Sequence, residues 1–122
     1  MAKILVVDDE RLLRTILKDA LEEAGYSVVL AENGQVALDR ARSDRPDCIL
    51  MDIIMPDLDG YNACASMKAD PALAAIPVFL ISATKDLRVA DRAEQVGAAG
   101  ILPKPFRVEE LLLTVALALN PA

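Results

Sequence analysis

The sequence of 122 residues contains no histidine, only two cysteines and few aromatic side chains. Without histidine, the chain has no Ser-His-Asp triad, no Cys-His pair and no histidine-ligated metal. Cys48 and Cys64 fall in a predicted strand and a predicted helix, where a free cysteine usually packs as a small apolar residue rather than in a disulfide or metal site. Aromatic residues make up 3% against a hydrophobic share of 54%, so we predict a mostly aliphatic core.

The chain also lacks an excess of basic residues and any long apolar run. Its net charge is −6, and an acidic surface argues against direct binding of nucleic acid. No apolar stretch is long enough to span a bilayer, and Lys3 leads directly into a short strand rather than into a signal peptide. We therefore expect a soluble, cytoplasmic protein that neither binds nucleic acid nor enters a membrane.

Short apolar runs alternate with segments of helical periodicity along the whole chain. The predicted strands cover residues 4–7, 26–32, 48–52, 76–81 and 100–102. The predicted helices cover residues 12–24, 36–41 after an N-cap at Asn33, 60–67, 86–96 and 108–119. Such alternation predicts a parallel sheet covered by helices on both faces. We expect one domain over residues 1–122 with a flavodoxin-like (βα)5 three-layer sandwich and strand order 2-1-3-4-5.

The first and last predicted helices show which side chains should face the core. In the first helix the buried face is expected to comprise Leu12, Leu13, Ile16, Leu17, Ala20, Leu21 and Ala24. In the last helix it is expected to comprise Val108, Leu111, Leu112, Val115 and Leu119. Leu113 and Leu117 fall off this face, and two explanations stay open. They are either scattered surface or more deeply buried leucines, or part of a surface for a partner or a second copy, formed with helix 86–96 and strand 100–102.

Polar side chains follow four of the five predicted strands. Asp8 and Asp9 end the first, Asp52 ends the third, Ser82 follows the fourth and Lys104 follows the fifth. Because parallel strands end at one edge of the sheet, we expect these side chains to share a pocket. Crowded carboxylates favour a hard divalent cation such as Mg²⁺. A cation, a lysine and a hydroxyl around one nucleophilic carboxylate suit phosphoryl transfer.

Taken singly, each of these residues has an ordinary explanation. Asp9 could cap the first helix, Ser82 could be a strand-end hydroxyl, and Lys104 could be a solvated loop lysine, although its flanking prolines restrict the backbone. Asp57 and Asp59 more simply belong to a loop turn. No glycine-rich loop ending in Gly-Lys-Ser/Thr is present, so nucleotide hydrolysis would lack a phosphate cradle.

Four motifs together closely resemble the receiver domain of two-component response regulators, over essentially the whole chain. They are Ile4-Leu5-Val6-Val7-Asp8-Asp9, Leu50-Met51-Asp52 followed by Met55-Pro56-Asp57-Leu58-Asp59-Gly60, Ile81-Ser82-Ala83, and Lys104-Pro105-Phe106. The resemblance implies that Asp52 is the phosphoacceptor and takes its phosphoryl group from a histidine kinase or a histidine phosphotransfer protein.

The same resemblance implies roles for the residues around Asp52. Mg²⁺, for which Mn²⁺ can substitute, would be bound by Asp9, Asp52 and the backbone carbonyl of Ile54, and by Asp8 through water. Ser82 and Ala83 would contact the phosphoryl group and reposition their loop, and Lys104 would pair with it. The Lys104–Pro105 peptide bond is expected to be cis.

Two positions depart from the family pattern. Where many members carry an aromatic switch residue, this chain has Ile101, so signalling is expected to depend on the segment from Ser82 to Thr84 and on helix 86–96. Two residues after the acceptor stands Ile54, which has no polar group to orient an attacking water. The sequence therefore predicts a long-lived phospho-Asp52.

Two other functions are alternatives to a phosphorylated receiver. Haloacid-dehalogenase-like phosphatases need a second aspartate at the position of Ile54, so we do not expect a multiple-turnover enzyme. A degenerate receiver that binds a partner without phosphorylation is the alternative, although the intact Asp8, Asp9, Asp52, Ser82 and Lys104 argue against it. No effector domain follows the last helix, so we expect either a single-domain regulator or an excised receiver, with output through a downstream protein or a homodimer.

Overall fold

The computed structural model describes residues 1–56, 58–83 and 88–119. Within these ranges, five strands and five helices alternate as the sequence predicts. The strands are β1 (Lys3–Val7), β2 (Ser27–Ala31), β3 (Cys48–Asp52), β4 (Val78–Ser82) and β5 (Gly100–Pro103). The helices are α1 (Arg11–Glu23), α2 (Gly34–Asp44), α3 (Gly60–Ala69), α4 (Arg88–Gln95) and α5 (Val108–Leu119).

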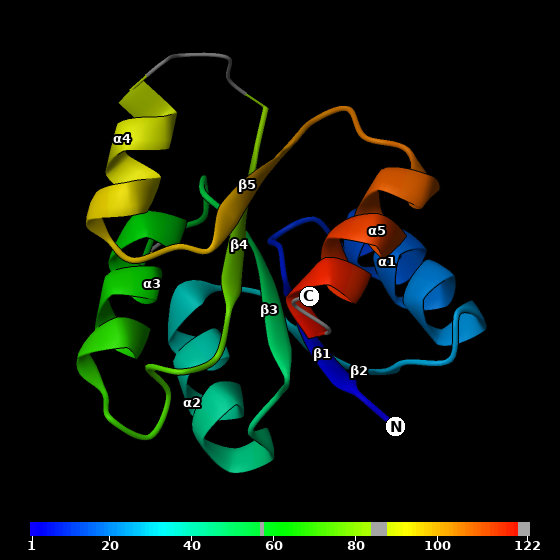
Figure 1. Ribbon diagram of the computed structural model, residues 1–122, viewed down its shortest axis with the longest axis horizontal. Helices are drawn as coiled ribbons and strands as arrows, with labels where there is room; N and C mark the ends of the chain where they lie inside the picture. The colour runs from blue at the N-terminus through cyan, green and yellow to red at the C-terminus, as the bar shows by residue number, and fades with distance from the viewer. Residues whose placement is uncertain (57, 84–87, 120–122) are drawn as a thin grey trace.

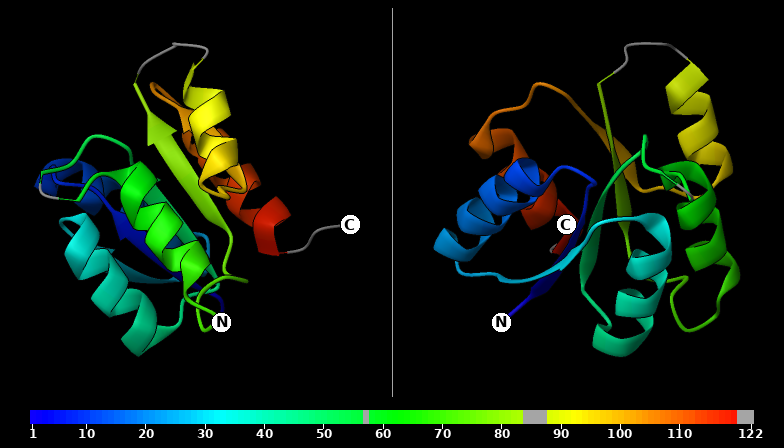
Figure 2. Two further views of the ribbon diagram at one scale, coloured as in Figure 1. Left: turned by 90° about the vertical axis from the view of Figure 1, so that its left-hand side faces the viewer. Right: turned by 180° about the vertical axis from the view of Figure 1, so that it is seen from behind.

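The five strands form one parallel sheet in the order β2-β1-β3-β4-β5, as expected. Helices α1 and α5 cover one face, and α2, α3 and α4 cover the other (Figure 1 and Figure 2). In the ladders Val7 pairs with Met51, and Asp52 pairs with Ile81. This register brings the carboxyl ends of β1, β3 and β4 to the same level at one edge of the sheet.

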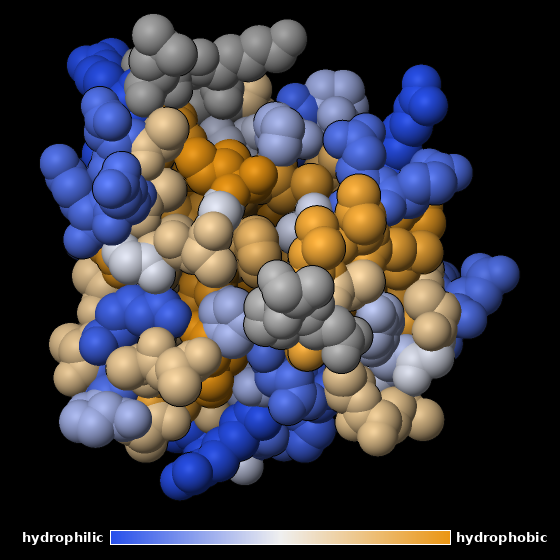
Figure 3. All heavy atoms as spheres, in the orientation of Figure 1, coloured by the Kyte–Doolittle hydropathy of each residue, from blue (hydrophilic) through white to orange (hydrophobic). Residues whose placement is uncertain are grey.

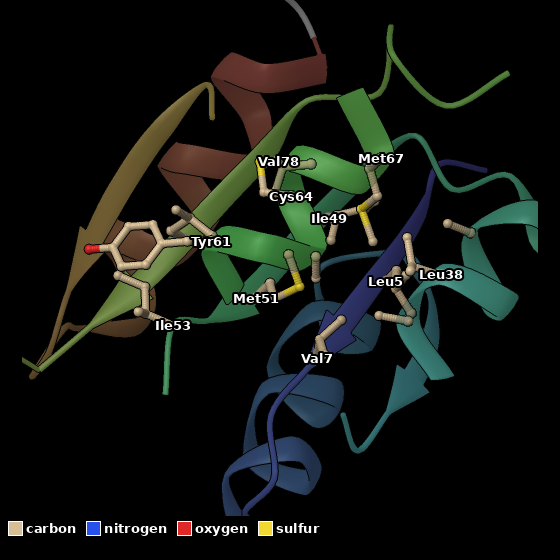
Figure 4. Close-up of a cluster of buried hydrophobic side chains, with 14 of the residues drawn as sticks. Leu5, Val7, Leu38, Ile49, Met51, Ile53, Tyr61, Cys64, Met67 and Val78 are labelled. Atoms are coloured by element: carbon tan, nitrogen blue, oxygen red, sulfur yellow. The ribbon is translucent and has the colours of Figure 1, made fainter. Parts of the chain in front are cut away.

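Each face of the sheet has its own hydrophobic cluster. Leu5, Val7, Ile49 and Met51 point toward α2 and α3 (Figure 4), and the alternate residues of β1 and β3 point toward α1 and α5. Apart from the end of β1 at Lys3, both strands are buried along their whole length. Uninterrupted apolar runs are therefore explained by burial on both faces.

The two cysteines are buried and free, as the sequence predicts. Burial raises the pKa of Cys48 to about 12 and also raises the pKa of Cys64. Because the thiolate is the reactive form of cysteine, both side chains act as apolar packing residues.

Side-chain caps set the start of two helices. Asn33 accepts a hydrogen bond from the backbone N–H of Val36 at 2.9 Å, which confirms its predicted place before α2. The carboxylate of Asp59 accepts from the N–H of Asn62 at 2.9 Å at the start of α3. The residue before α1 is Glu10, whose side chain makes no capping bond. Asp9 is therefore not the helix cap that one explanation of the Asp8-Asp9 pair suggested.

Four side chains predicted to be buried in the first and last helices are exposed. Leu12 is 73% exposed, and Ile16, Ala24 and Val108 are also on the surface. The apolar stripe of α1 is wider than the strip of sheet that this helix covers, and only Leu17 and Leu21 are fully enclosed. Ile16 and Val108 instead line a groove of about 470 Å³ between α1 and the start of α5.

The surface around β5 and α5 is also rich in hydrophobic side chains (Figure 3). Leu113 and Leu117 are 60% and 59% exposed, so they do not belong to the core, as the periodicity of α5 indicated. Next to Leu117 is a groove of about 400 Å³ that is also lined by Phe79 and Ile101. In the part of the chain that the structure describes, no helix is long and apolar enough to cross a bilayer.

Candidate functional site

The carboxyl edge of the sheet holds a cavity of about 250 Å³. Its lining comprises Asp9, Glu10, Asp52, Ile53, Ile54, Ser82, Ala83 and Lys104. Asp52 and Ser82 are the last residues of β3 and β4, and Lys104 directly follows β5. Parallel strands end together, so residues far apart in the sequence meet here, as the strand order predicts.

Three carboxylates lie together at this edge. One oxygen from each of Asp8, Asp9 and Asp52 lies within 4.8 Å of the others. Asp8 and Asp52 are buried, whereas Asp9 is exposed. Hard carboxylate oxygens at this density match the ligand preference of Mg²⁺ and Mn²⁺.

Asp8 has one satisfied and one unsatisfied carboxylate oxygen. Its Oδ1 accepts a hydrogen bond from the N–H of Glu10 at 2.8 Å. Its Oδ2 is buried and has no hydrogen-bond partner among the described residues. A buried carboxylate oxygen that lacks a partner is costly, and a cation or its bound water would satisfy it. This observation is independent of the residue types and supports a divalent cation at the cluster.

The surroundings of Asp8 and Lys104 change their affinity for protons. The pKa of Asp8 is raised to about 6 in total, mainly by burial. The neighbouring Asp52 also raises this pKa, whereas the N–H of Glu10 and the positive charge of Lys104 lower it. For Lys104, burial favours the neutral amine, but the hydrogen bond and charge of Asp52 raise its pKa overall. Lys104 is therefore a fixed positive charge within the acidic cluster.

Lys104 bridges two of the carboxylates. Its Nζ donates to Asp52 Oδ2 at 2.7 Å and lies 3.7 Å from Asp8 Oδ2. The backbone N–H of Lys104 donates to the carbonyl of Ser82 at 2.7 Å. The Lys104–Pro105 peptide bond is cis, the isomer that the family resemblance implied.

Backbone contacts position Asp52 from the other side. Its Oδ1 accepts from the N–H of Ile54 at 2.9 Å, and the N–H of Gly60 donates to the carbonyl of Ile53 at 2.9 Å. A Cβ on Gly60 would overlap the backbone oxygen of Asp52. Only glycine allows the first turn of α3 to approach β3 so closely. The sequence indicated Gly60 merely as the start of a helix.

The two atypical positions lie at different depths. Ile54 is 74% exposed and places an apolar side chain in the lining of the cavity. Ile101 is half-buried and packs against the larger core cluster. Asp57 and Thr84, which the sequence placed in the adjoining loops, lie outside the described residues.

Sequence reasoning missed Arg14. Its Nη1 donates to the backbone carbonyl of Asp8 at 2.6 Å. Helical side chains tilt toward the N-terminus, so a basic residue in the first turn of α1 could have been expected to reach back to the end of β1.

The sequence and the fold of this chain match known proteins. Residues 4–116 match the family model described as the response regulator receiver domain. The chain is 41% identical over 110 residues to the response regulators MprA of Mycolicibacterium vanbaalenii and Mycobacterium tuberculosis. The match covers 90% of this chain and 47% of each relative. The chain thus spans about half the length of these curated relatives.

Solved structures show the same fold. The chemotaxis response regulator CheY4 of Vibrio cholerae aligns with a TM-score of 0.91 and 32% identity, covering 97% of this chain and 98% of that chain. The receiver domain of a signal transduction histidine kinase from Syntrophus aciditrophicus aligns with a TM-score of 0.92 and 34% identity, covering 100% and 92%.

We predict that Asp8→Asn stabilises the metal-free protein at pH 7 by about 1–3 kcal/mol, given about 1.4 kcal/mol per pKa unit. The pKa of Asp8 is raised from 3.8 to about 6 on folding. The folded state therefore holds this proton more tightly, and the wild type loses stability as pH rises from about 4 to about 6. Asparagine keeps the oxygen that accepts from Glu10 and cannot ionise.

Chemical denaturation in a chelator, at pH values from 4 to 7.5, measures this difference. The gap between the two proteins should be small near pH 4 and should open above it. Asp19→Asn, which changes an exposed carboxylate of α1, serves as the control and should show no such opening. A gap that is equal at both ends of the range would contradict the prediction.

Proposed function

Because this chain belongs to the family of response regulator receiver domains, we propose that it accepts a phosphoryl group on Asp52. The donor is the phosphohistidine of a histidine kinase or a phosphotransfer protein. A carboxylate oxygen of Asp52 attacks phosphorus, the bond from phosphorus to the histidine nitrogen breaks, and an acyl phosphate forms. The main support is the position of Asp52, on the cavity and 2.7 Å from Lys104 Nζ.

The proposed cofactor is Mg²⁺, with Mn²⁺ as a substitute. Asp9, Asp52 and the backbone carbonyl of Ile54 would be the direct ligands, and Asp8 would act through a water molecule. The Oδ2 of Asp8, which is buried and accepts no hydrogen bond from the described residues, supports this assignment. When bound, the cation neutralises charge on the transferring phosphoryl oxygens.

The remaining residues orient and hold the phosphoryl group. Lys104 already contacts Asp52 and would form an ion pair with the phosphoryl oxygens once Asp52 is phosphorylated. Ser82, the last residue of β4, and Ala83 line the same cavity. The hydroxyl of Ser82 would donate to a phosphoryl oxygen and draw its loop toward the site. Preorganised donors of this kind stabilise the charge that develops during transfer.

The domain is proposed to be a signalling module that assists its own phosphorylation and slow dephosphorylation, rather than a multiple-turnover enzyme. Dephosphorylation requires water in line with the bond from phosphorus to Asp52. Ile54 supplies neither an acid nor a base at the mouth of the cavity. A phosphorylation-independent binding module is the alternative, and it would fail the phosphorylation test below.

The output surface is proposed to comprise α4, β5 and α5. Leu113 and Leu117 are exposed on α5, and Leu117 lines a groove together with Phe79 and Ile101. The guanidinium carbon of Arg92 lies 4.1 Å from the centroid of the Tyr61 ring, so Arg92 is engaged within the domain. The apolar residues of α5 are therefore the stronger candidates for contact with a downstream protein or a second copy.

We predict that Mg²⁺ with acetyl phosphate or phosphoramidate adds one phosphoryl group to the protein, detected as a gain in intact mass. Asp52→Asn should not gain this mass because an amide cannot form the acyl phosphate. Removing the metal with a chelator should also abolish the gain. If neither donor modifies the wild type, the domain instead works as a binding module that needs no phosphorylation.

We also predict that Ile54→Asn and Ile54→Glu shorten the lifetime of phospho-Asp52 by about one to two orders of magnitude, the lower range for a positioned acid–base group. Either polar side chain can orient a water that isoleucine cannot. The decay of the phosphorylated mass over time measures this rate, and Ile54→Val is the apolar control. Unchanged or slower decay in both polar variants would count against the role of Ile54.

For the output surface, we predict that phosphorylation promotes self-association and that Leu117→Gln weakens it by about tenfold, as expected for one well-packed interface residue. Sedimentation of the phosphorylated protein measures the effect. Leu12→Gln changes an even more exposed leucine, on α1, and should have no effect. A phosphorylated wild type that stays monomeric would reject the homodimer and direct the search to a downstream protein.

A further inference from the structure

The backbone at the end of β1 accepts a hydrogen bond from a side chain that has no role in the proposed phosphoryl transfer. We infer that Arg14 is a positioning residue for the divalent cation site, an inference that rests on the proposed function. Arg14 lies in the first turn of α1 and is half-buried. Its Nη1 donates to the backbone carbonyl of Asp8 at 2.6 Å.

Asp8 is fixed by three hydrogen bonds, and Arg14 makes one of them. The N–H of Asp8 donates to the carbonyl of Ala31 at 3.1 Å, and Oδ1 accepts from the N–H of Glu10 at 2.8 Å. Arg14 satisfies the backbone carbonyl of Asp8. Of the two carboxylate oxygens, Oδ2 is the one that accepts no hydrogen bond from the described residues. The three bonds therefore direct the unsatisfied oxygen into the acidic cluster.

The held carbonyl belongs to the peptide that joins Asp8 to Asp9. Rotation of this peptide would move both carboxylates, one of which is buried and the other exposed. The N–H of Arg14 also donates to the carbonyl of Glu10 at 3.1 Å. Arg14 thus connects the end of β1 with the start of α1 and constrains the turn that contains both carboxylates.

Arginine suits this task for two physical reasons. A hydrogen bond from a charged donor is shorter and stronger than one between neutral groups. The guanidinium is planar and presents its donors in a fixed fork, whereas the lysine ammonium is a point charge on a flexible stem. Arg14→Lys therefore preserves the charge and removes the directional donor.

Position and charge predict opposite effects on cation binding. Arg14 is a positive charge near the acidic cluster, so through its field alone it repels a divalent cation, and removing it should tighten Mg²⁺ binding. If Arg14 instead orients the ligands, removing it should weaken Mg²⁺ binding. Loss of residues that orient metal ligands typically costs about 10- to 100-fold in metal affinity.

The test compares Mg²⁺ affinity of the full chain in four proteins: wild type, Arg14→Met, Arg14→Lys and Arg11→Met. Arg11 is exposed at the start of α1, so Arg11→Met removes the same charge without touching Asp8. Calorimetric titration with Mg²⁺ gives the affinities, and thermal unfolding in a chelator gives the stability of the metal-free fold. We expect about tenfold weaker Mg²⁺ binding in Arg14→Met, a smaller loss in Arg14→Lys, and no loss in Arg11→Met.

Each other result has a defined meaning. Equal or tighter Mg²⁺ binding by Arg14→Met overturns the inference, and so does a lower melting temperature with unchanged Mg²⁺ affinity, which would show a purely structural role. If Arg14→Met does not fold, Arg14→Lys decides, because its charge is that of the wild type. A wild type that is phosphorylated on Asp52 while the Arg14 variants bind Mg²⁺ normally rejects this inference alone. A wild type that binds no Mg²⁺ rejects the proposed cation site as well.

Discussion

Repulsion among three carboxylates at one edge of the sheet is the constraint on which the site depends. Asp8 and Asp52 are buried beside the exposed Asp9, and the backbones that carry the two buried carboxylates are held by β1 and β3, which are enclosed on both faces. Lys104 relieves this repulsion by contact with Asp52, but it leaves Asp8 Oδ2 without a hydrogen bond among the described residues. The site thus brings three carboxylates together with a single lysine in contact with them among the described residues, which is consistent with the proposed cation.

Most of this arrangement could be predicted from the sequence because it follows from strand order. Once short apolar runs alternate with helices, the parallel order brings Asp52, Ser82 and Lys104 to one edge without further information. The Asn33 cap and the buried cysteines were predictable for a similar reason, since each depends on local residues. The sequence therefore predicted which residues meet, and the structure adds how they contact one another.

What could not be predicted depends on packing between elements. The pattern of α1 indicates an apolar stripe, but not how much of that stripe the sheet covers, so Leu12 was wrongly placed in the core. The close approach of Gly60 to Asp52 and the bond from Arg14 to Asp8 depend on where two elements lie relative to each other. The pKa of Asp8 depends on its burial as well as on its charged neighbours, and burial emerges only when the chain is folded.

The two atypical isoleucines lie in different places: Ile54 is at the proposed phosphorylation site, and Ile101 is at the proposed output surface. Ile54 lines the cavity, where its proposed effect is on the access of water, whereas Ile101 packs against the core and also lines the groove that includes Leu117. An aromatic side chain at Ile101 could change between buried and exposed rotamers, but isoleucine has no ring with which to report such a change. In the proposed function, β4 and β5 themselves then offer one route from Asp52 to α5, beside the expected route through the segment from Ser82 to Thr84 and α4. The bond from the N–H of Lys104 to the carbonyl of Ser82, at 2.7 Å, couples the ends of these two strands. A pull on Lys104 by a phosphoryl group would therefore act directly on the backbone of both strands.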